Sequence, residues 1–398
     1  MEIKPDIETF AKIKVVGVGG SGGAAVNRML AAKVRGVEFV AINTDAQALH
    51  HNAAPKKIHV GQTVTRGLGA GMDPDLGKKS AEEDSEQIYD ALKGTDMVFI
   101  SCGLGGGTGT GASPVVADIA REIGALTVAV VTKPFSFEGS QRKTIAEQGY
   151  DELAGKVDTI ITIPNDRIFQ VIEKKTTLLA AFETVDDVLR QGVQGISDII
   201  TVPGLINVDF ADVRAIMRNS GSALMGIGRA TGDNRAVDAA KAAIDSPLLE
   251  ISIDGARGIL FTITGGHNLT MNEVSDASRV ITASADPNAK IIFGAIIDEN
   301  LKDEIKVTVV ATGFGPGAMK QAARTQEQPL PRGSSYVNIS PPPTPSGRSV
   351  FHEQVAPRPA MRPTPPPPAP TSNQQHDNAQ EGNDDELEIP AFIRKKMM

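Results

Sequence analysis

One run of nine residues, six of them glycine, constrains this chain more than any other stretch. The run occupies positions 103–111 and reads Gly-Leu-Gly-Gly-Gly-Thr-Gly-Thr-Gly. A strand-like apolar segment (97–102) precedes it, and a helix-like segment (114–123) follows it. Strand, glycine loop and helix in this order place backbone N–H groups around an anion, and glycine lets phosphate oxygens approach the backbone. We therefore predict a phosphate site without the lysine of a P-loop, and keep an ordinary glycine-rich turn as the alternative.

The first half of the chain alternates predicted strands with predicted helices. The strands are 12–18, 37–42, 97–102, 126–132 and 158–163, and the helices include 24–32, 76–92 and 114–123. This alternation is typical of a doubly wound, mostly parallel sheet, in which ligands bind beyond the carboxyl ends of the strands. Glycine-rich or polar turns follow the strands at these ends. Their shared placement is stronger evidence for a binding site than any single motif.

The first of these turns also matches a dinucleotide-binding fingerprint. Gly17, Gly19 and Gly22 have G-x-G-x-x-G spacing. Asp45 lies about 20 positions beyond them, where such a fold places an acidic residue on a ribose. An NAD(P)-binding oxidoreductase is therefore an alternative from the residues alone, although it leaves the six-glycine run unexplained.

A long helix and an acidic turn follow this first half. Apolar residues recur at spacings of three and four over 177–200, which predicts a 24-residue helix of roughly 36 Å. Two glycines in its second half indicate close packing against a neighbouring element. Asn207, Asp209 and Asp212 then crowd the start of a short helix. The plain interpretation is that Asp209 caps this helix and that Asp212 lies beside its dipole.

The segment after the acidic turn reads as a second, α+β domain. The predicted strands are 223–229, 258–264, 291–297 and 305–311, and the predicted helices are 236–243 and 271–283. This part of the chain carries no glycine-rich cradle of its own, so the predicted phosphate site belongs to the first half.

Composition and charge argue against several classes of protein. The formal net charge of −8 argues against a basic face that binds nucleic acid. No apolar run reaches the roughly 18 residues of a membrane span, and the polar N-terminus is unlike a signal peptide. A single cysteine, Cys102, allows no intrachain disulfide, which fits a reducing cytoplasm. The six histidines show no metal-ligand spacing.

The C-terminal part of the chain changes sharply in composition. Sixteen of the 25 prolines lie at or after Pro316, and residues 318–384 are rich in Pro, Ser, Gln and Asn. Such a stretch buries too little apolar surface to offset the cost of ordering, so we predict a disordered linker. Apolar residues return at the end of the chain, at Leu387, Ile389, Phe392 and Ile393. They predict a short docking peptide, with a frayed terminus as the alternative.

Two stretches resemble the signatures of a known family. The run at 105–111 resembles the signature of the tubulin/FtsZ family of GTPases. The segment 207–212, Asn-Val-Asp-Phe-Ala-Asp, resembles the second signature of the FtsZ branch of that family. The resemblance extends over about 12–313, and 389–394 resembles the tail peptide of the branch. It implies a cytoplasmic GTPase that polymerises head to tail into the filaments of the cell-division ring.

The resemblance also implies roles for individual residues. GTP would be bound by Gly20, Ser21, Gly22, Gly23, Ala24, Asn43, Gly71, Gly103, Gly106, Gly107, Thr108, Gly109, Thr110, Glu138, Arg142, Asn165, Phe182 and Asp186. The catalytic residues, reaching the γ-phosphate of the next subunit, would be Asn207, Asp209 and Asp212. Membrane-tethering division proteins would bind Leu387, Ile389, Pro390, Phe392, Ile393 and Arg394. Mg²⁺ would be held mainly by phosphates and water, without a metal site built by the protein.

Guanine selection follows from the same implied roles. Asn165 and Asp186 would hydrogen-bond the guanine edge, while Phe182 would stack on the base. An aspartate that accepts hydrogen bonds from guanine N1 and N2 rejects adenine, because the adenine edge does not supply those donors. A regulator that binds GTP without hydrolysing it or assembling stays open as a further alternative.

One position departs from the family pattern. The family usually has Gly-Gly-Asn-Pro where this chain has Gly-Met-Asp-Pro at 71–74. If the second glycine of that pattern requires a positive φ, Met72 would be strained. Contacts from this loop to the nucleotide would then differ from those of the family.

These expectations divide the chain into six segments of a tubulin/FtsZ-like α/β protein. They are a flexible N-terminus (1–11), a doubly wound, mostly parallel GTP-binding domain (12–176), a long central helix (177–202), a second α+β domain with the acidic loop (203–313), a disordered linker (314–385) and a docking peptide (386–398). The binding site is expected in the second segment and the acidic loop in the fourth.

Overall fold

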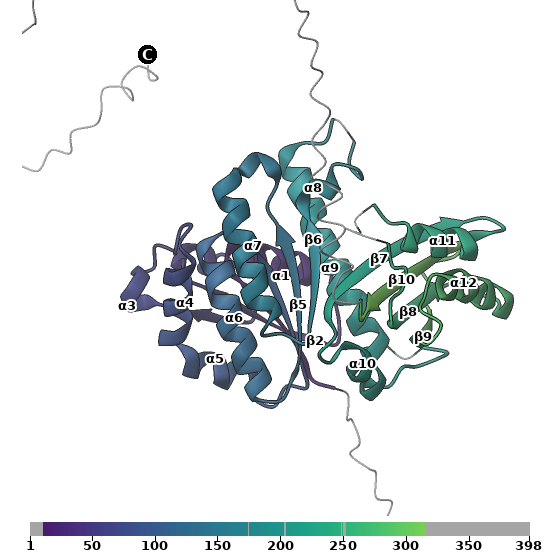
Figure 1. Cartoon of the computed structure of the whole chain (residues 1–398), viewed down its shortest axis with the longest axis horizontal. Helices are drawn as coiled ribbons and strands as arrows, with labels where there is room; N and C mark the ends of the chain where they lie inside the picture. The colour runs from purple at the N-terminus through teal and green to yellow at the C-terminus, as the bar shows by residue number, and fades with distance from the viewer. Residues whose placement is uncertain (1–10, 174, 203, 248, 250–251, 315–398) are drawn as a thin grey trace, which may run out of the picture. The chain divides into compact units, whose positions relative to one another are not determined.

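The strands of the protein pair into one continuous sheet (Figure 1). The computed structural model describes residues 11–314 apart from 174, 203, 248 and 250–251. Among these residues ten strands pair in the order β3-β2-β1-β4-β5-β6-β7-β10-β8-β9. The strands are β1 (Ile13–Val18), β2 (Val37–Asn43), β3 (Lys56–His59), β4 (Met97–Gly103), β5 (Leu126–Lys133), β6 (Thr159–Pro164), β7 (Gly221–Thr231), β8 (Gly258–Gly265), β9 (Lys290–Ile297) and β10 (Glu304–Thr312). The helices are α1 (Gly19–Ala31), α2 (Ala46–His50), α3 (Gln62–Thr65), α4 (Pro74–Glu83), α5 (Ser85–Leu92), α6 (Gly107–Glu122), the 3-10 turn η1 (Ser136–Glu138), α7 (Ser140–Ala154), α8 (Asn165–Ile168), α9 (Leu178–Thr201), α10 (Phe210–Met217), α11 (Arg235–Ile244) and α12 (Met271–Ala283).

The sheet is parallel over the N-terminal strands and mixed beyond them. Every pair from β3 to β7 is parallel, whereas β10 pairs antiparallel with both β7 and β8, and β9 is parallel to β8. The junction is narrow, because β6 and β7 pair only at Thr159–Ile161 and Gly221–Ala223. The predicted α/β fold with a central parallel sheet is confirmed. Strand β3 and the short helices α2, α3 and α8 were not predicted, since four or five residues carry too little periodicity.

The parallel strands are buried on both faces, because successive side chains of a strand point to opposite sides. In β1, Val15 belongs to an apolar core shared with α1 and α9, whereas Val16 belongs to a core shared with α5, α6 and α7. A third core lies between α11, α12 and the strands β8 and β10. Burying one such side chain contributes about 1.5–3 kcal/mol, so both helical layers stabilise the strands whose ends carry the loops.

Helix α9 has the predicted length of 24 residues. Thr177 caps its N-terminus through the side-chain oxygen. A Cβ on Gly192 would lie 3.1 Å from the Met225 side chain in β7, and one on Gly195 would lie 2.8 Å from the Thr308 side chain in β10. The prediction of close packing is therefore confirmed, and the two glycines let α9 approach both strands.

Two predicted helix starts are wrong, because α1 and α6 begin inside the glycine runs. They begin at Gly19 and Gly107 rather than at positions 24 and 114. Glycine costs a helix about 1 kcal/mol per residue relative to alanine, so starts within the glycine runs need compensating contacts. Packing explains the observed start of α6: a Cβ on Gly111 would lie 1.9 Å from the carbonyl oxygen of Pro74, so only glycine lets α4 lie this close.

The predicted helix 76–92 is also wrong, because it consists of two helices, α4 and α5. The break falls at Asp84, whose carboxylate accepts a hydrogen bond from the backbone N–H of Gly61 at 2.8 Å. This contact joins positions far apart in the sequence, so local periodicity carries no sign of it. Pro74 is the first residue of α4, and Asp73 caps the helix by accepting the N–H of Leu76.

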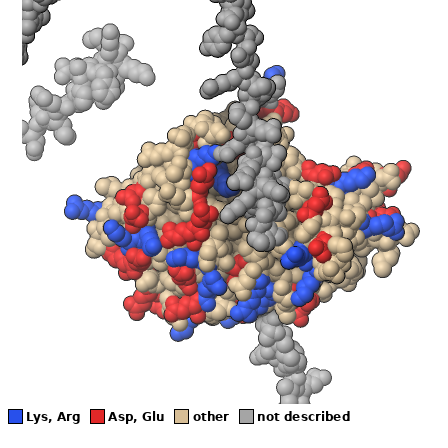
Figure 2. All heavy atoms as spheres, viewed as in Figure 1, with Lys and Arg blue, Asp and Glu red and all other residues tan. Residues whose placement is uncertain are grey.

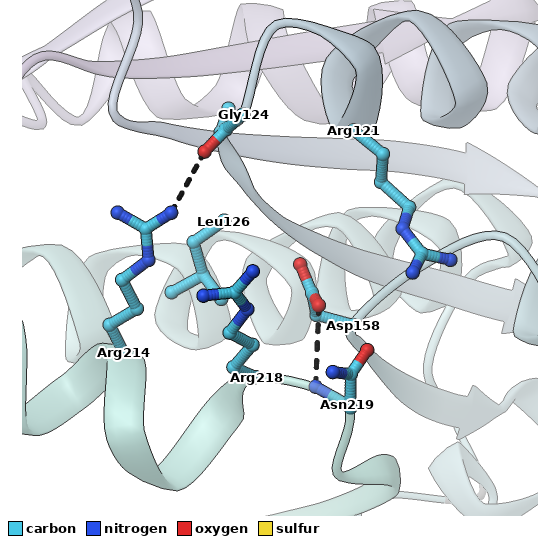
Figure 3. Close-up of a pocket in the computed structure, with 8 residues that line it drawn as sticks. Arg121, Gly124, Leu126, Asp158, Arg214, Arg218 and Asn219 are labelled. Atoms are coloured by element: carbon cyan, nitrogen blue, oxygen red, sulfur yellow. Dashed lines mark hydrogen bonds between the residues drawn. The ribbon is translucent and has the colours of Figure 1, made fainter.

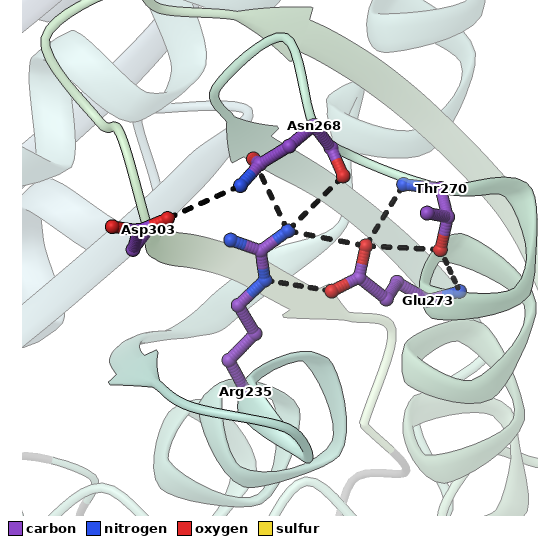
Figure 4. A network of polar contacts seen from close by, with 5 residues as sticks. All are labelled: Arg235, Asn268, Thr270, Glu273 and Asp303. Atoms are coloured by element: carbon purple, nitrogen blue, oxygen red, sulfur yellow. Dashed lines mark hydrogen bonds and ion pairs between the residues drawn. The ribbon is translucent and has the colours of Figure 1, made fainter.

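A partly buried ion pair ties α11 to α12 (Figure 4). Nε of Arg235 in α11 donates to Glu273 in α12 at 2.6 Å, and Nη2 donates to Asn268 at 3.2 Å. Thr270 caps α12 and donates to the same glutamate. The hydrogen bond from Arg235 holds the pKa of Glu273 below its usual range.

The two ends of the chain lie outside the described residues. The docking peptide (386–398), nearly all of the linker (314–385) and all but one residue of the N-terminal segment therefore stay predictions. Within the described part, none of the helices is both long enough and apolar enough to cross a bilayer.

Candidate functional site

Two helix N-termini meet at the carboxyl ends of neighbouring strands. Helix α1 follows β1 and α6 follows β4, and the two strands are paired. Gly19 has φ 73°, and a Cβ there would lie 2.9 Å from the backbone N of Gly109. Helix α6 has Gly106 as its cap residue and no side-chain cap, so backbone N–H groups of its first turn face outward for an anion. One donor is already used, since the Gly107 N–H binds the carbonyl oxygen of Gly71 at 2.7 Å.

The threonines of the glycine run hold the loop in shape. The Thr108 hydroxyl lies 2.6 Å from that of Thr44, which follows β2. The Thr110 hydroxyl accepts the backbone N–H of Gly105 at 2.9 Å. Thr108 and Thr110 are both buried, and their contacts fix the direction of the N–H groups at the start of α6.

Some loop glycines leave open space where a ligand can lie. A Cβ on Gly20 or on Gly106 would meet no atom within 4 Å. Gly20, Gly23, Ala24 and Asn43 also line one cavity of about 140 Å³ beside α1. The structure thus brings these sequence-predicted residues together around an open cradle.

Other glycines of the loops are needed for packing. A Cβ on Gly22 would lie 2.2 Å from the carbonyl oxygen of Ser101 in β4. A Cβ on Gly103 would lie 2.8 Å from the side chain of Ser21. These close approaches bring the start of α1 against β4, which is how the two phosphate-loop candidates come to share one site.

Glu138 and Arg142 lie at the edge of this cradle. They form an ion pair at 3.0 Å, and Glu138 also accepts the backbone N–H of Phe135 at 2.7 Å. A Cβ on Gly105 would lie 2.9 Å from Cγ of Arg142, so the arginine stem covers the glycine run. The Nε of Arg142 is buried and has no hydrogen-bond partner among the described residues.

An aromatic cluster lies beside the ends of β5 and β6. Phe135 is buried and contacts Phe137, Phe169 and Phe182, with ring centroids 5.0, 5.2 and 5.6 Å away. Phe182 itself is 42% exposed, so it has a free face for a planar ligand. Sequence reasoning missed Phe135, although its place in the turn after β5 was the available signal.

Asn165 and Asp186 bring two polar groups to this cluster. The Oδ1 atom of Asn165, at the start of α8, is buried without a hydrogen-bond partner in the described part of the chain. Asp186 lies one turn after Phe182 in α9. Burial raises the pKa of Asp186 to about 6, Arg28 opposes this shift and Glu183 adds to it. No sequence signal linked Arg28 of α1 to this site.

The acidic turn lies elsewhere, at the amino ends of the parallel strands. Asp209 caps α10 by accepting the Ala211 N–H at 3.0 Å, which confirms the capping interpretation. In the same helix, Nη2 of Arg214 donates to the carbonyl oxygen of Gly124, just before β5 begins. The phosphate-loop candidates lie at the other end of these strands, and the eight residues of β5 span about 26 Å. Within one chain the structure therefore does not bring the exposed side chains of Asn207, Asp209 and Asp212 to the glycine loops.

Family models match both halves of the described structure. A model of the Tubulin/FtsZ family, GTPase domain, matches residues 12–173, and a model of the FtsZ family, C-terminal domain, matches residues 221–315. This chain belongs to the tubulin/FtsZ family. Its members with the matched N-terminal domain are GTPases, and the glycine loops of α1 and α6 lie within the matched residues.

Solved structures of relatives agree with this assignment. The empty FtsZ dimer of M. jannaschii is 48% identical, covers 77% of this chain and 89% of its own, and superposes with a TM-score of 0.74. CetZ2 from Haloferax volcanii, solved as a GTPγS-bound protofilament, is 20% identical with a TM-score of 0.66 over 79% of this chain and 98% of its own. The second similarity shows the shared fold alone.

The loop that departs from the family pattern is not strained. Among the described residues, the non-glycine residues with positive φ are Lys33, Arg66 and Asn219. Gly71 takes φ 56°, and Met72, 44% exposed, follows it without a left-handed conformation. The strain that a second required glycine would cause is therefore absent at Met72.

The dinucleotide alternative is not favoured. Asp45 caps α2, and its Oδ1 atom accepts the N–H groups of Gln47 and Ala48 at 2.9 and 3.0 Å, so that oxygen is not free for a ribose.

Within the described residues no group of three or more His, Cys, Asp or Glu side chains is placed to hold a metal ion.

Proposed function

We propose that this protein is a GTPase that assembles head to tail, and that the acidic loop of one copy completes the active site of the next. The supporting observation is that, within one chain, the acidic loop and the glycine loops are separated by about the length of β5. Asn207, Asp209 and Asp212 are all exposed at the amino ends of the strands, so they are free to meet a second molecule. A contact between opposite ends of identical copies is heterologous, and it builds filaments when its rotation does not close.

The GTP-binding role is assigned to the residues around the cradle. The uncapped N-terminus of α6 and the open space at Gly20 and Gly106 fit phosphate groups. The unpartnered Nε of Arg142 fits a ribose or phosphate oxygen. On the base side, Phe182 would stack on guanine while Asn165 and Asp186 bind its polar edge.

Catalysis in this proposal consists of positioning and charge stabilisation. The carboxylates of Asp209 and Asp212 orient and polarise the attacking water, and Asn207 helps to place it. Backbone N–H groups at Thr108 and Gly109 stabilise the charge that develops on the transferred phosphoryl group. Mg²⁺, held mainly by phosphate oxygens and water, would supply further charge neutralisation when bound.

The cellular role is proposed from family membership. The FtsZ of M. jannaschii, 48% identical, was solved as a dimer, which supports self-association. We place this protein in the cytoplasm, in the filaments of the cell-division ring. Its C-terminal peptide, outside the described residues, would bind membrane-tethering division proteins.

Phosphate release and light scattering test the proposal when they are followed together after adding GTP and Mg²⁺. The rate should rise more steeply than linearly with protein concentration near the assembly threshold, because hydrolysis needs two copies. Asp212→Ala should bind GTP and release little phosphate, while Asp276→Ala, a half-exposed control on α12, should behave as the wild type. A strictly linear rate contradicts the shared site. GTP binding with neither hydrolysis nor sedimentation would instead identify a non-polymerising regulator.

A further inference from the structure

A second cavity lies at the end of the sheet opposite the glycine loops (Figure 3). Its volume is about 150 Å³, several times the roughly 30 Å³ that one water molecule occupies. Three arginines line it: Arg121 from the last turn of α6, and Arg214 and Arg218 from α10 and its C-cap. Figure 2 shows Lys and Arg side chains gathered on the lower middle of the face drawn there. None of these arginines has a role in the proposed GTP site.

The positive charge of this cavity is not balanced by its own lining. Asp158 is the single carboxylate among the lining residues, so three positive charges face one negative charge. Arg214 uses one N–H group on the carbonyl oxygen of Gly124, at 2.9 Å. The side chains of Arg121 and Arg218 make no hydrogen bond or ion pair within the described part of the chain. Guanidinium groups gathered in a concave site create a positive potential that attracts anions.

The carboxylate of Asp158 is already occupied by hydrogen bonds from backbone N–H groups. Asp158 is 6% exposed, and its oxygens accept the backbone N–H groups of Thr127 at 3.0 Å and Asn219 at 3.3 Å. Asn219 holds a left-handed conformation with φ 52°, and the N–H of Gly221 binds the Asp158 carbonyl oxygen at 3.0 Å. The carboxylate therefore shapes the floor of the cavity, and the arginine donors remain available to a ligand.

We infer that this cavity binds a compact oxyanion with two or more negative charges, of the class of phosphate or pyrophosphate. The planar fork of arginine matches phosphate oxygens in pairs of charge-assisted hydrogen bonds. The guanidinium groups of Arg121 and Arg218, which have no partners, and that of Arg214, which uses one N–H group, together supply enough donors to surround such an anion.

The position of the cavity connects it to the acidic loop. Helix α10 has eight residues and is about 12 Å long. Arg214 and Arg218 lie toward its C-terminal end, while Asp209 and Asp212 lie at its N-terminal end. An anion held by the arginines therefore restrains the same short helix that presents the acidic loop. This consequence rests on the proposed function, whereas the binding itself does not.

Calorimetric titration with pyrophosphate tests the inference without requiring hydrolysis or assembly. The proteins are the wild type saturated with GDP, the double variant Arg121→Gln/Arg218→Gln and the control Arg257→Gln/Arg279→Gln, which loses two exposed arginines elsewhere. The first double variant should bind pyrophosphate about ten-fold more weakly or worse, because two charged donor groups are lost. The control should stay within about two-fold of the wild type. Both replaced arginines lack partners in the described structure, so urea unfolding should show an intact fold.

Gly106→Asp, which places a carboxylate in the open space of the glycine loop, separates the cavity from the GTP site. Pyrophosphate binding that persists in this variant supports the inference, and binding that disappears assigns the anion to the GTP site instead. No binding to the wild type at millimolar pyrophosphate overturns the inference. If the wild type binds no pyrophosphate and assembly is nevertheless weakened in Arg121→Gln/Arg218→Gln, the arginines contact an acidic surface of a second copy, which also overturns the inference.

Discussion

Lowering the pH from 7 to 5 should weaken guanine-nucleotide binding by about ten-fold through Asp186 alone. Burial raises the pKa of this carboxyl group to about 6. Only the ionised form accepts both guanine donors, so the apparent affinity follows the ionised fraction. With a pKa of about 6 that fraction is about 0.9 at pH 7 and about 0.1 at pH 5.

The assay is fluorescence titration with a labelled GDP between pH 5 and pH 8. The terminal phosphate of the labelled GDP also titrates in this range. The wild type must therefore be compared with Asp186→Asn, in which the nucleotide phosphate alone contributes to the pH dependence of binding. Asp186→Asn should bind more weakly at pH 7 and show a flatter pH profile. Glu183→Gln removes a carboxylate that raises the pKa of Asp186, so its midpoint should move to lower pH. Equal pH profiles for the wild type and Asp186→Asn would refute the reasoning.

The same shift has a consequence for the nucleotide-free protein. A carboxyl group whose pKa is higher in the folded state makes folding less favourable once it ionises. This effect is absent below the unfolded pKa of 3.8 and complete above about 6, so stability falls as the pH rises through that window. Asp186→Asn should therefore unfold at a higher urea concentration than the wild type at pH 7, even though it binds guanine less well.

Three further predictions concern stability and the tail. Arg235→Ala should lower the free energy of unfolding by about 3 kcal/mol in urea titration, because it leaves Glu273 without its cation, and a loss below about 1 kcal/mol would contradict this. Gly111→Ala should cost about 3 kcal/mol or more, since its Cβ would lie 1.9 Å from the Pro74 carbonyl oxygen, and a fold as stable as the wild type would show that α4 and α6 move apart easily. Deleting residues 387–398 should abolish localisation to the division site in cells while leaving phosphate release nearly intact, and equal loss of both would place the tail in the folded core.

The sequence predicted the elements whose signal is local. The apolar runs and the polar turns that follow them gave the central strands and the ends at which the loops lie. The 3–4 spacing of apolar residues gave α9 to within one residue. The predicted helix of 24 residues between the glycine loops and the acidic turn corresponds to α9, and Asn207, Asp209 and Asp212 lie beyond it in the chain.

What the sequence did not predict depends on contacts between distant segments. The break at Asp84 is set by a hydrogen bond to Gly61, and the early start of α6 is set by the carbonyl oxygen of Pro74. The cavity lined by Arg121 and Arg218 joins residues almost a hundred positions apart, each of which reads alone as an ordinary surface arginine. Its charge becomes visible only when the folded chain brings the two together.

A mixing experiment distinguishes an active site shared between two copies from one completed within a single chain. Asp212→Ala keeps its phosphate loops and lacks one acidic residue. Gly106→Asp keeps the acidic loop and places a negative charge where phosphate would bind, in space that holds no atom within 4 Å. Gly155→Asp, at the end of α7, is the control for an added charge.

Phosphate release is measured for each protein alone and for equal mixtures, with co-sedimentation to confirm that the variants assemble together. Asp212→Ala and Gly106→Asp should each be nearly inactive alone, whereas Gly155→Asp should be as active as the wild type. In the mixture, GTP bound to an Asp212→Ala subunit can meet the intact Asp212 of a Gly106→Asp neighbour, so the account predicts that part of the activity returns. In the control mixture, GTP bound to an Asp212→Ala subunit can likewise meet the intact acidic loop of a Gly155→Asp neighbour. Phosphate release should therefore be retained in that mixture too. Co-assembled Asp212→Ala and Gly106→Asp that stay as inactive as the separate proteins would contradict the shared site.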